Sequence, residues 1–333
     1  MFELWSLGFT LHTPMPLLEI KNLKLDFLSG DIPLRAVDDV SLTLNAGETV
    51  CLVGESGCGK SVTALSIARL VPAPPARYAG GEILLNGRDV LKMSKTELCG
   101  LRGGVVSYVF QEPSASLNPV FRVGSQIKEA LKLHRPAKAT NDEVIRLLKL
   151  VGIPAPESRL KDYPFQMSGG MQQRVMIAMA LASEPKLLVA DEPTTALDVT
   201  IQAQILELLR DLKRRLGMAI LLITHNLGIV GDMADRVAVM YAGQIVELAP
   251  ARDLLRRPLH PYTKALIASV PKLAGGARRL SAIAGNVPRI GDFPPGCRFY
   301  PRCPTARPEC ENVPPPLAEL EPGRWVRCAY ALS

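Results

Sequence analysis

The run from Gly54 to Ser61 has the sequence G-E-S-G-C-G-K-S, which suits a loop that binds phosphate. Its three glycines let successive backbone N–H groups face one concavity, which attracts phosphate oxygens at the start of a helix. Lys60 adds a charge for the β- and γ-phosphates, and the Ser61 hydroxyl suits Mg²⁺. The run therefore predicts a nucleotide site. The expected contacts are Gly54, Glu55, Ser56, Gly57, Cys58, Gly59, Lys60, Ser61 and Val62.

Two adjacent carboxylates end the apolar run 187–190. If the run is a strand of a parallel sheet, this end opens onto the ligand crevice. Asp191 would then help to hold Mg²⁺, and Glu192 would polarise the water that attacks the γ-phosphate. Alone, such a run could equally end in a helix N-cap. The phosphate loop upstream favours the chemical interpretation.

Two further positions suit phosphate chemistry. Ser168-Gly-Gly170 precedes a helical pattern and would form an anion-binding nest, although a simple N-cap with a turn is the usual interpretation of such a motif. His225 follows the apolar run 219–223, where a lone histidine is more often structural. Its place after the strand that follows Glu192 favours a catalytic role.

The elements that must position these residues alternate between strands and helices, which predicts an α/β fold with a mostly parallel sheet. We expect antiparallel strands within 17–50, a hairpin at Asn86-Gly87, strands at 105–110, 187–190 and 219–223, a helix at 201–216 and a hairpin at 237–247. A helical insertion spans about 95–183.

Three segments follow from composition. Residues 1–16 are expected to be a leader, and the start stays open between Met1 and Met15; residues 17–250 form the core domain. Residues 251–333 form a small Cys- and Pro-rich module, reached through a helix near 260–270 and a linker at Gly275-Gly276.

The positive charge lies in the C-terminal part. Residues 251–333 contain 13 Lys or Arg and 6 Asp or Glu, which accounts for the whole net charge of +7. A solvated basic face explains this best, and proximity to a membrane surface is the alternative. The sequence has no extended run in which aromatic and basic residues alternate as in single-strand binders, so no nucleic-acid partner is expected. Without a basic region before the apolar N-terminal stretch, we expect a cytoplasmic chain.

The ordered set of motifs resembles the ATP-binding-cassette (ABC) family over residues 17–250. The set comprises Gly54–Ser61, Gln111, Ser168-Gly-Gly-Met-Gln-Gln, Asp191-Glu192, Ala196-Leu-Asp198 and His225. The resemblance implies the P-loop NTPase fold of an ABC nucleotide-binding domain, with an antiparallel β-subdomain and a helical subdomain. It also implies an ATPase that uses ATP and Mg²⁺ and closes head to tail with a second such domain.

The resemblance assigns roles within one chain. Gln111 would link Mg²⁺ and the lytic water to a transmembrane partner, and His225 would contact the γ-phosphate and orient Glu192. Phe27, 33 residues before Lys60, would stack on adenine. An ordinary core aromatic on a strand is the alternative interpretation of Phe27.

The resemblance also assigns roles across a dimer. Ser168, Gly169 and Gly170 would grip the γ-phosphate of ATP bound to the opposite subunit, and Asp198 would lie at the dimer seam. Two positions depart from the usual pattern: Met167 replaces a leucine, and Cys58 stands where serine is common. The Cys58 thiol could make nucleotide binding sensitive to alkylation, although a tolerated small residue is the simpler interpretation.

Four cysteines mark the C-terminal module. Cys297, Cys303, Cys310 and Cys328 have five, six and seventeen residues between them. Zinc sites usually contain a pair of ligands separated by two to four residues, which this spacing lacks. Iron–sulfur clusters tolerate wider loops, and proline follows Cys303 as in ferredoxin-type runs. Spacing alone leaves an iron–sulfur cluster, zinc, and free or disulfide-bonded thiols open.

The tail resembles the C-terminal extension of oligopeptide/dipeptide permease ATPases. The motifs are Pro258-x-His-Pro-Tyr-Thr263, Gly285-Asn-Val-Pro288 and Gly296-Cys-Arg-Phe-x-Pro-Arg-Cys-Pro304, with Gln111-Glu-Pro-Ser-Ala-Ser-Leu-Asn-Pro119 in the core. The resemblance implies a [4Fe–4S] cluster on the four cysteines, with a structural task. His260 within the first motif is expected to start a helix and pack, not to catalyse.

The resemblance implies an ATPase subunit of an importer for peptides or related small solutes. Its partners would be a second ABC ATPase, which we expect to be a paralogue, two transmembrane permease subunits and an extracytoplasmic solute-binding protein. The chain would lie at the cytoplasmic face of the inner (plasma) membrane. The solute stays open among dipeptides, oligopeptides, nickel chelates and glutathione.

Two other classes compete with this interpretation. A soluble ABC ATPase acting on nucleic acid or ribosomes would usually have a long coiled-coil insertion or a second cassette, and the sequence has neither. The second competing class is a non-catalytic iron–sulfur or scaffold protein with a degenerate cassette. The intact Lys60, Glu192 and His225 argue against this class.

Overall fold

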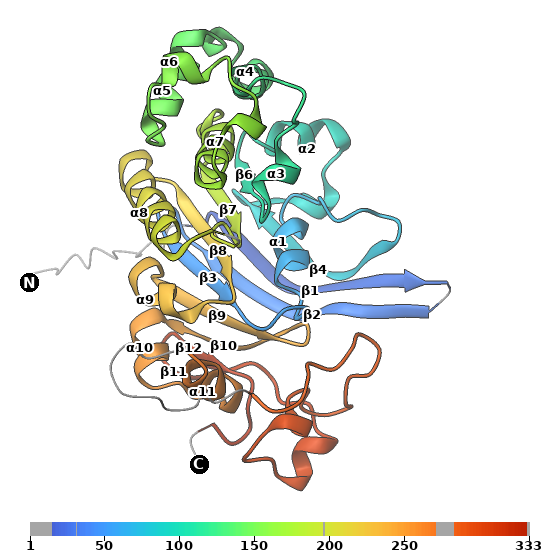
Figure 1. Ribbon diagram of the computed structural model, residues 1–333. Coiled ribbons are helices and arrows are strands. Elements are labelled where there is room, and N and C mark those ends of the chain that lie inside the picture. The colour runs from blue at the N-terminus through green and yellow to red at the C-terminus, as the bar shows by residue number, and fades with distance from the viewer. Residues whose placement is uncertain (1–14, 31, 196, 271–282, 332–333) are drawn as a thin grey trace, which may run out of the picture.

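Two β-sheets form the centre of the molecule (Figure 1). The structure is a computed structural model, which describes residues 15–30, 32–195, 197–270 and 283–331. The larger sheet has eight strands among these residues. In sheet order they are β11 (Ala318–Glu321), β12 (Arg324–Val326), β10 (Gln244–Pro250), β9 (Arg236–Tyr241), β3 (Thr49–Val53), β8 (Ala219–Thr224), β7 (Leu187–Asp191) and β6 (Val106–Val109).

The middle of this sheet is parallel and buried. β9, β3, β8, β7 and β6 pair in parallel, and every residue of β3 and β8 is buried. Short runs of Val, Leu and Ile fit such strands, since both faces are covered. The strands expected at 105–110, 187–190 and 219–223 are therefore confirmed. Their carboxyl ends share one edge of the sheet, which lies beside the phosphate loop.

The smaller sheet is antiparallel. It contains β2 (Ile32–Leu44), β1 (Leu18–Ser29), β4 (Ala76–Leu85) and β5 (Arg88–Asp89), in that order. Between β4 and β5, Asn86 and Gly87 both have positive φ, +50° and +74°. Two successive positive φ values define the tight turn that Asn-Gly favours, so the predicted hairpin is confirmed.

Helices make a separate lobe at one end of the molecule, above the sheets in Figure 1. The lobe contains α4 (Val123–His134), α5 (Asn141–Leu150), α6 (Pro156–Arg159) and α7 (Gly169–Leu181). The remaining helices near the sheets are α1 (Lys60–Ser66), α2 (Lys95–Leu101), α3 (Pro113–Ser116), α8 (Val199–Leu216) and α9 (Val230–Met233). The helix expected at 201–216 is observed as α8, and the helices of the lobe lie within the segment expected as a helical insertion, although β6 in the same segment belongs to the larger sheet.

The C-terminal segment packs at the opposite side, in orange and red in Figure 1. It contains α10 (Ala251–Arg256), α11 (Pro261–Ala268) and the last two strands. β12 pairs with β10 through Glu247 and Val326, so the segment extends the main sheet across the expected boundary at 250. The expected leader (except residues 15 and 16) and the Gly275-Gly276 linker lie outside the described residues.

Short 3₁₀ turns complete the structure. They are η1 (Val90–Lys92), η2 (Pro136–Lys138), η3 (Pro164–Gln166), η4 (Leu227–Ile229), η5 (Tyr300–Arg302) and η6 (Pro308–Glu311). A search of the described helices finds none with the length and apolar character that crossing a bilayer requires.

Candidate active site

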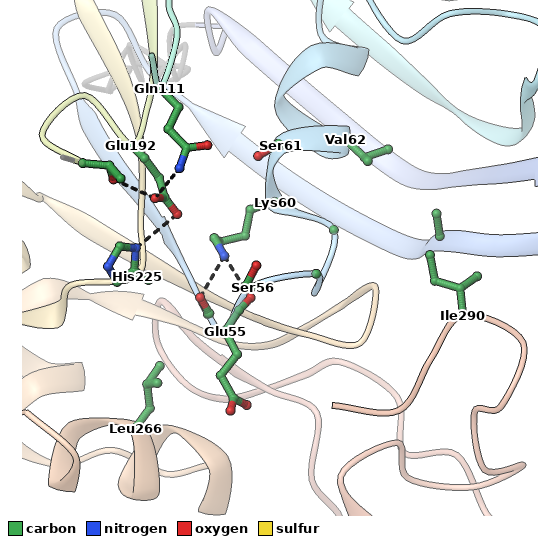
Figure 2. A pocket seen from close by; sticks show the side chains of 15 residues that line it. Glu55, Ser56, Lys60, Ser61, Val62, Gln111, Glu192, His225, Leu266 and Ile290 are labelled. Atoms are coloured by element: carbon green, nitrogen blue, oxygen red, sulfur yellow. Dashed lines mark hydrogen bonds and ion pairs between the residues drawn. The ribbon is translucent and has the colours of Figure 1, made fainter. Parts of the chain in front are cut away.

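A cavity of about 780 Å³ opens where the phosphate loop meets the carboxyl ends of the parallel strands (Figure 2). It is lined by Ala36, Gly54, Glu55, Ser56, Gly57, Gly59, Lys60, Ser61, Val62, Gln111, Glu192, Thr195, His225, Leu266 and Ile290. Most residues expected from the sequence are thus brought together. Ala36, Thr195, Leu266 and Ile290 were not foreseen.

The phosphate loop has a backbone shape that side chains would block. Gly54, Gly57 and Gly59 have φ of +154°, +77° and +102°. A Cβ on Gly54 would collide with the carbonyl oxygen of Met240, so only glycine fits there. Nζ of Lys60 donates hydrogen bonds to the carbonyl oxygens of Gly54 and Glu55, at 2.8 and 2.9 Å.

Glu192 is held by three side chains. The Thr195 hydroxyl donates to Oε2 at 2.8 Å, and Nε2 of Gln111 donates to the same oxygen at 3.3 Å. Nδ1 of His225 lies 3.2 Å from Oε1. Figure 2 shows Gln111 and His225 reaching Glu192 from two sides. Gln111, Glu192 and His225 follow β6, β7 and β8, so parallel pairing brings them together.

The environment of Glu192 keeps it ionised. Burial would raise its pKa, but hydrogen bonds from Thr195 and His225 outweigh burial and hold the pKa below its usual value. The residue also has φ of +48°, an uncommon backbone conformation for glutamate. A carboxylate that is ionised and fixed in this way can accept a proton from a nearby water.

Asp191 and Ser61 form a pair suited to Mg²⁺. The Ser61 side chain is hydrogen-bonded to Asp191, whose pKa is raised, mainly by burial. A hydroxyl and a carboxylate are oxygen donors of the kind that Mg²⁺ prefers, and this ion usually keeps several waters. The two residues therefore fit the ion that the sequence predicts.

The residues expected at a dimer seam lie elsewhere. Ser168 caps α7 by accepting a hydrogen bond from the backbone N–H of Met171, and Gly169 and Gly170 begin that helix. Asp198 precedes α8 without a side-chain cap. None of the four lines the cavity of this chain, and their roles toward a second subunit stay predictions. Ala196 lies outside the described residues.

Phe27 is half-buried on β1 and packs against the core around the smaller sheet. It pairs with Leu34 and Ala76 and does not line the cavity. The adenine-stacking role therefore stays a prediction. Ala36 of β2 and Ile290 of the C-terminal segment line the cavity instead, and no local pattern around Ile290 predicts this.

The four C-terminal cysteines lie within electrostatic reach of one another. Burial raises the pKa of Cys297 to about 11, and the other three cysteines add to the rise. Yet within the described part of the chain, no three His, Cys, Asp or Glu side chains form a group that could hold a metal ion. The side-chain positions therefore do not support the predicted cluster on Cys297, Cys303, Cys310 and Cys328.

His260 has the role that its motif predicts. Its Nδ1 accepts a hydrogen bond from the backbone N–H of Tyr262 at 3.0 Å and so caps α11. The side chain is buried, which lowers its pKa to about 3. His260 is thus a neutral structural residue.

Comparison with known proteins agrees with this architecture. Residues 37–195 match the model of the ABC transporter family, and residues 246–310 match the oligopeptide/dipeptide transporter C-terminal region. The solved structure of the ATP-binding cassette MJ0796, a dimer bound to ADP and Pi, has a TM-score of 0.63 at 27% identity. The match covers 71% of this chain and 99% of that one.

Relatives match almost the full length. The oligopeptide transport ATP-binding protein AppD of Bacillus subtilis is 50% identical, with 94% of this chain and 96% of the relative covered. The dipeptide transport ATP-binding protein DppD of Haemophilus influenzae is 49% identical, with 96% and 97% covered. This chain therefore belongs to the ABC transporter family of ATPases and carries the C-terminal region of its oligopeptide/dipeptide transporter branch.

Proposed function

We propose that this chain hydrolyses ATP to power the import of peptides across the cytoplasmic membrane. The observation that carries the proposal is the ionised Glu192, held by Thr195, Gln111 and His225 in a cavity that the phosphate loop lines. The names of the relatives support peptides as the solute.

In the proposed reaction the phosphate loop binds the β- and γ-phosphates through its backbone N–H groups and Lys60. Asp191 and Ser61 would hold Mg²⁺, and the ion would supply positive charge beside the phosphates. Glu192 accepts a proton as water attacks the γ-phosphorus in line with the leaving ADP oxygen. His225 orients Glu192 and contacts the γ-phosphate. Gln111 orients the water and links the nucleotide site to the membrane subunits.

The proposed active form is a dimer. Ser168, Gly169 and Gly170 of one subunit close over the γ-phosphate bound to the other, and Asp198 lies at the seam. Their place outside the cavity of their own chain supports this arrangement, because α7 starts away from the phosphate loop. The second subunit is a paralogue in this proposal, and Phe27 stacks on the adenine.

The proposed membrane partners are two permease subunits, served by an extracytoplasmic solute-binding protein. The segment that follows β6 supports a docking surface, since Phe110, Val120 and Phe121 are exposed by 41%, 73% and 56%. Contiguous exposed apolar patches are typical of interaction sites, and Val120 and Phe121 are adjacent in the chain. Docking there places the chain on the cytoplasmic face of the membrane.

We also propose an iron–sulfur cluster on Cys297, Cys303, Cys310 and Cys328, although the side-chain positions do not form a ligand set. The proposal rests on the four thiols sharing one small module and on a spacing that suits zinc less. Metal and sulfide analysis after anaerobic purification of the complex tests it. About four iron and four sulfide per chain, lost in Cys303→Ser, are expected; zinc or no metal contradicts it.

The transport proposal is tested by reconstituting the complete complex in vesicles with its solute-binding protein. Labelled di- and oligopeptides should accumulate with ATP, and Glu192→Gln in this chain should stop accumulation. Accumulation of a nickel chelate but no peptide would overturn the solute assignment and leave the ATPase assignment intact.

A further inference from the structure

One residue of the phosphate loop is bound through all three of its polar groups. The backbone N–H of Glu55 donates to the Tyr262 hydroxyl at 3.0 Å, and its carbonyl oxygen accepts from Nζ of Lys60 at 2.9 Å. Its carboxylate binds the guanidinium of Arg302 through two hydrogen bonds, at 2.8 and 3.0 Å. Tyr262 and Arg302 both belong to the C-terminal segment, so this segment holds the loop.

The guanidinium of Arg302 is itself fixed. Its side chain is only 4% exposed, whereas that of Glu55 is 29% exposed. Nε donates to the carbonyl oxygen of Ala284 at 2.9 Å, and Nη1 lies 3.4 Å from the Tyr241 hydroxyl. A two-pronged contact from a buried guanidinium fixes direction as well as distance. The position of the Glu55 carboxylate is therefore set by the C-terminal segment.

Aromatic packing attaches this segment to the main sheet. Tyr241 at the end of β9 lies 4.7 Å from Tyr262 and 5.2 Å from Phe299, measured between ring centroids. Phe299 is buried and comes three residues before Arg302. The sheet therefore carries both groups that contact Glu55, and the contact joins residues 247 positions apart in the chain.

We propose that Arg302 is a positioning residue for the nucleotide site, through which the C-terminal module keeps the phosphate loop open. The inference rests on the proposed nucleotide site. Lys60 now binds carbonyl oxygens of the loop, and it must leave them to reach a phosphate. Tyr262 holds the peptide N–H of Glu55, and Arg302 holds its carboxylate, while the lysine moves. The concavity then keeps its shape without binding energy from the nucleotide.

Arg302→Met tests this, because methionine retains much of the volume and loses the charge. In the whole complex, the affinity for a fluorescent ATP analogue should fall by about tenfold, as expected for losing a hydrogen bond between charged groups. The ATP concentration dependence of hydrolysis should show a clear rise in KM and a much smaller change in kcat. Unchanged affinity in Arg302→Met would overturn the proposal.

Arg298→Met is the matched control. Arg298 lies on the same segment and binds Asp38 at 2.6 Å, but among the described residues it forms no hydrogen bond or ion pair with the phosphate loop. The affinity of the Arg298→Met complex for the analogue should stay near that of the wild type. Equal losses in both variants would overturn the proposal, because docking of the segment alone would then explain them.

A double variant separates the path through Glu55 from other effects. If Arg302 acts through this carboxylate, Glu55→Gln combined with Arg302→Met should bind the analogue about as well as Arg302→Met alone. Additive losses would show that the two residues act independently and overturn the proposal. If the wild-type complex fails to bind the analogue, the proposed ATPase function fails instead, so the two failures are distinguishable.

Discussion

His225 and Glu192 are hydrogen-bonding partners across neighbouring strands, with Nδ1 of the histidine 3.2 Å from Oε1 of the glutamate. β7 and β8 pair in parallel, and each residue directly follows its strand. Thr195 and Gln111 bind the other carboxylate oxygen. Both oxygens of Glu192 are therefore oriented before any substrate arrives, which is the arrangement that a general base requires.

Replacing Glu192 with glutamine should stop ATP turnover and leave ATP binding and dimer closure intact. Glutamine has nearly the same shape but cannot accept a proton from water, so a loss of about 10²- to 10⁴-fold in kcat is expected. Phosphate release by the assembled complex and binding of a fluorescent ATP analogue measure the two properties. Hydrolysis near the wild-type rate would show that another group is the base.

Thr195 should set the pH range over which Glu192 works. Burial would raise the pKa of Glu192, and the bond from Thr195 is the first interaction that counters it. In Thr195→Val this bond is lost, so the pKa rises and more of the carboxyl is protonated at mildly acidic pH. The acidic limb of the pH profile of kcat/KM should therefore move to higher pH.

The control for this experiment is Thr195→Ser, which retains the hydroxyl. Its pH profile should match that of the wild type, whereas the valine variant should lose activity first as the pH falls. Profiles of all three proteins measured between pH 5 and pH 8 provide the comparison. Identical acidic limbs in the valine and wild-type proteins would show that Thr195 does not influence the pKa of Glu192.

The sequence is sufficient for the parts of the site that depend on local pattern. The phosphate loop needs glycines at set spacing, and Asp191 and Glu192 end a buried apolar strand. Parallel pairing then brings them beside Gln111 and His225. Thr195 could have been found, since a hydroxyl three residues after a catalytic carboxylate can turn back toward it.

The C-terminal contribution could not be predicted in the same way. β11 and β12 are only four and three residues long, so they have too few residues for a recognisable alternation. From a proline-rich segment, Ile290 reaches the cavity and Arg302 reaches the phosphate loop. A contact between residues so far apart in sequence leaves no periodic trace, and its geometry appears only when the chain is folded.

Cys58 should resist alkylation, which agrees with the simpler interpretation of a tolerated small residue. The side chain is fully buried, and burial raises the pKa of its thiol. Since the thiolate is the reactive form, iodoacetamide should label the exposed Cys99 first. Mass spectrometry of tryptic peptides and ATP binding after labelling measure this. Early labelling of Cys58 with loss of binding would mean that the loop opens readily.

His260 should make the folded protein sensitive to mild acid. Burial lowers its pKa from 6.5 to about 3, so folding favours the neutral form. Its contribution to stability is complete above pH 6.5 and is lost as the pH falls toward 3. Between pH 7 and pH 5 the free energy of unfolding should drop by about 2 kcal/mol from this group.

His260→Asn separates this effect from the titration of other groups. Asparagine can still cap α11 through its side-chain oxygen, but it does not titrate. The variant can be less stable at pH 7, because the smaller side chain packs less well against Phe299, which lies 5.9 Å from the imidazole. Urea denaturation at both pH values gives the change for each protein. The wild type should lose more stability than the variant on acidification, and equal losses would mean that the buried imidazole is not the group that titrates.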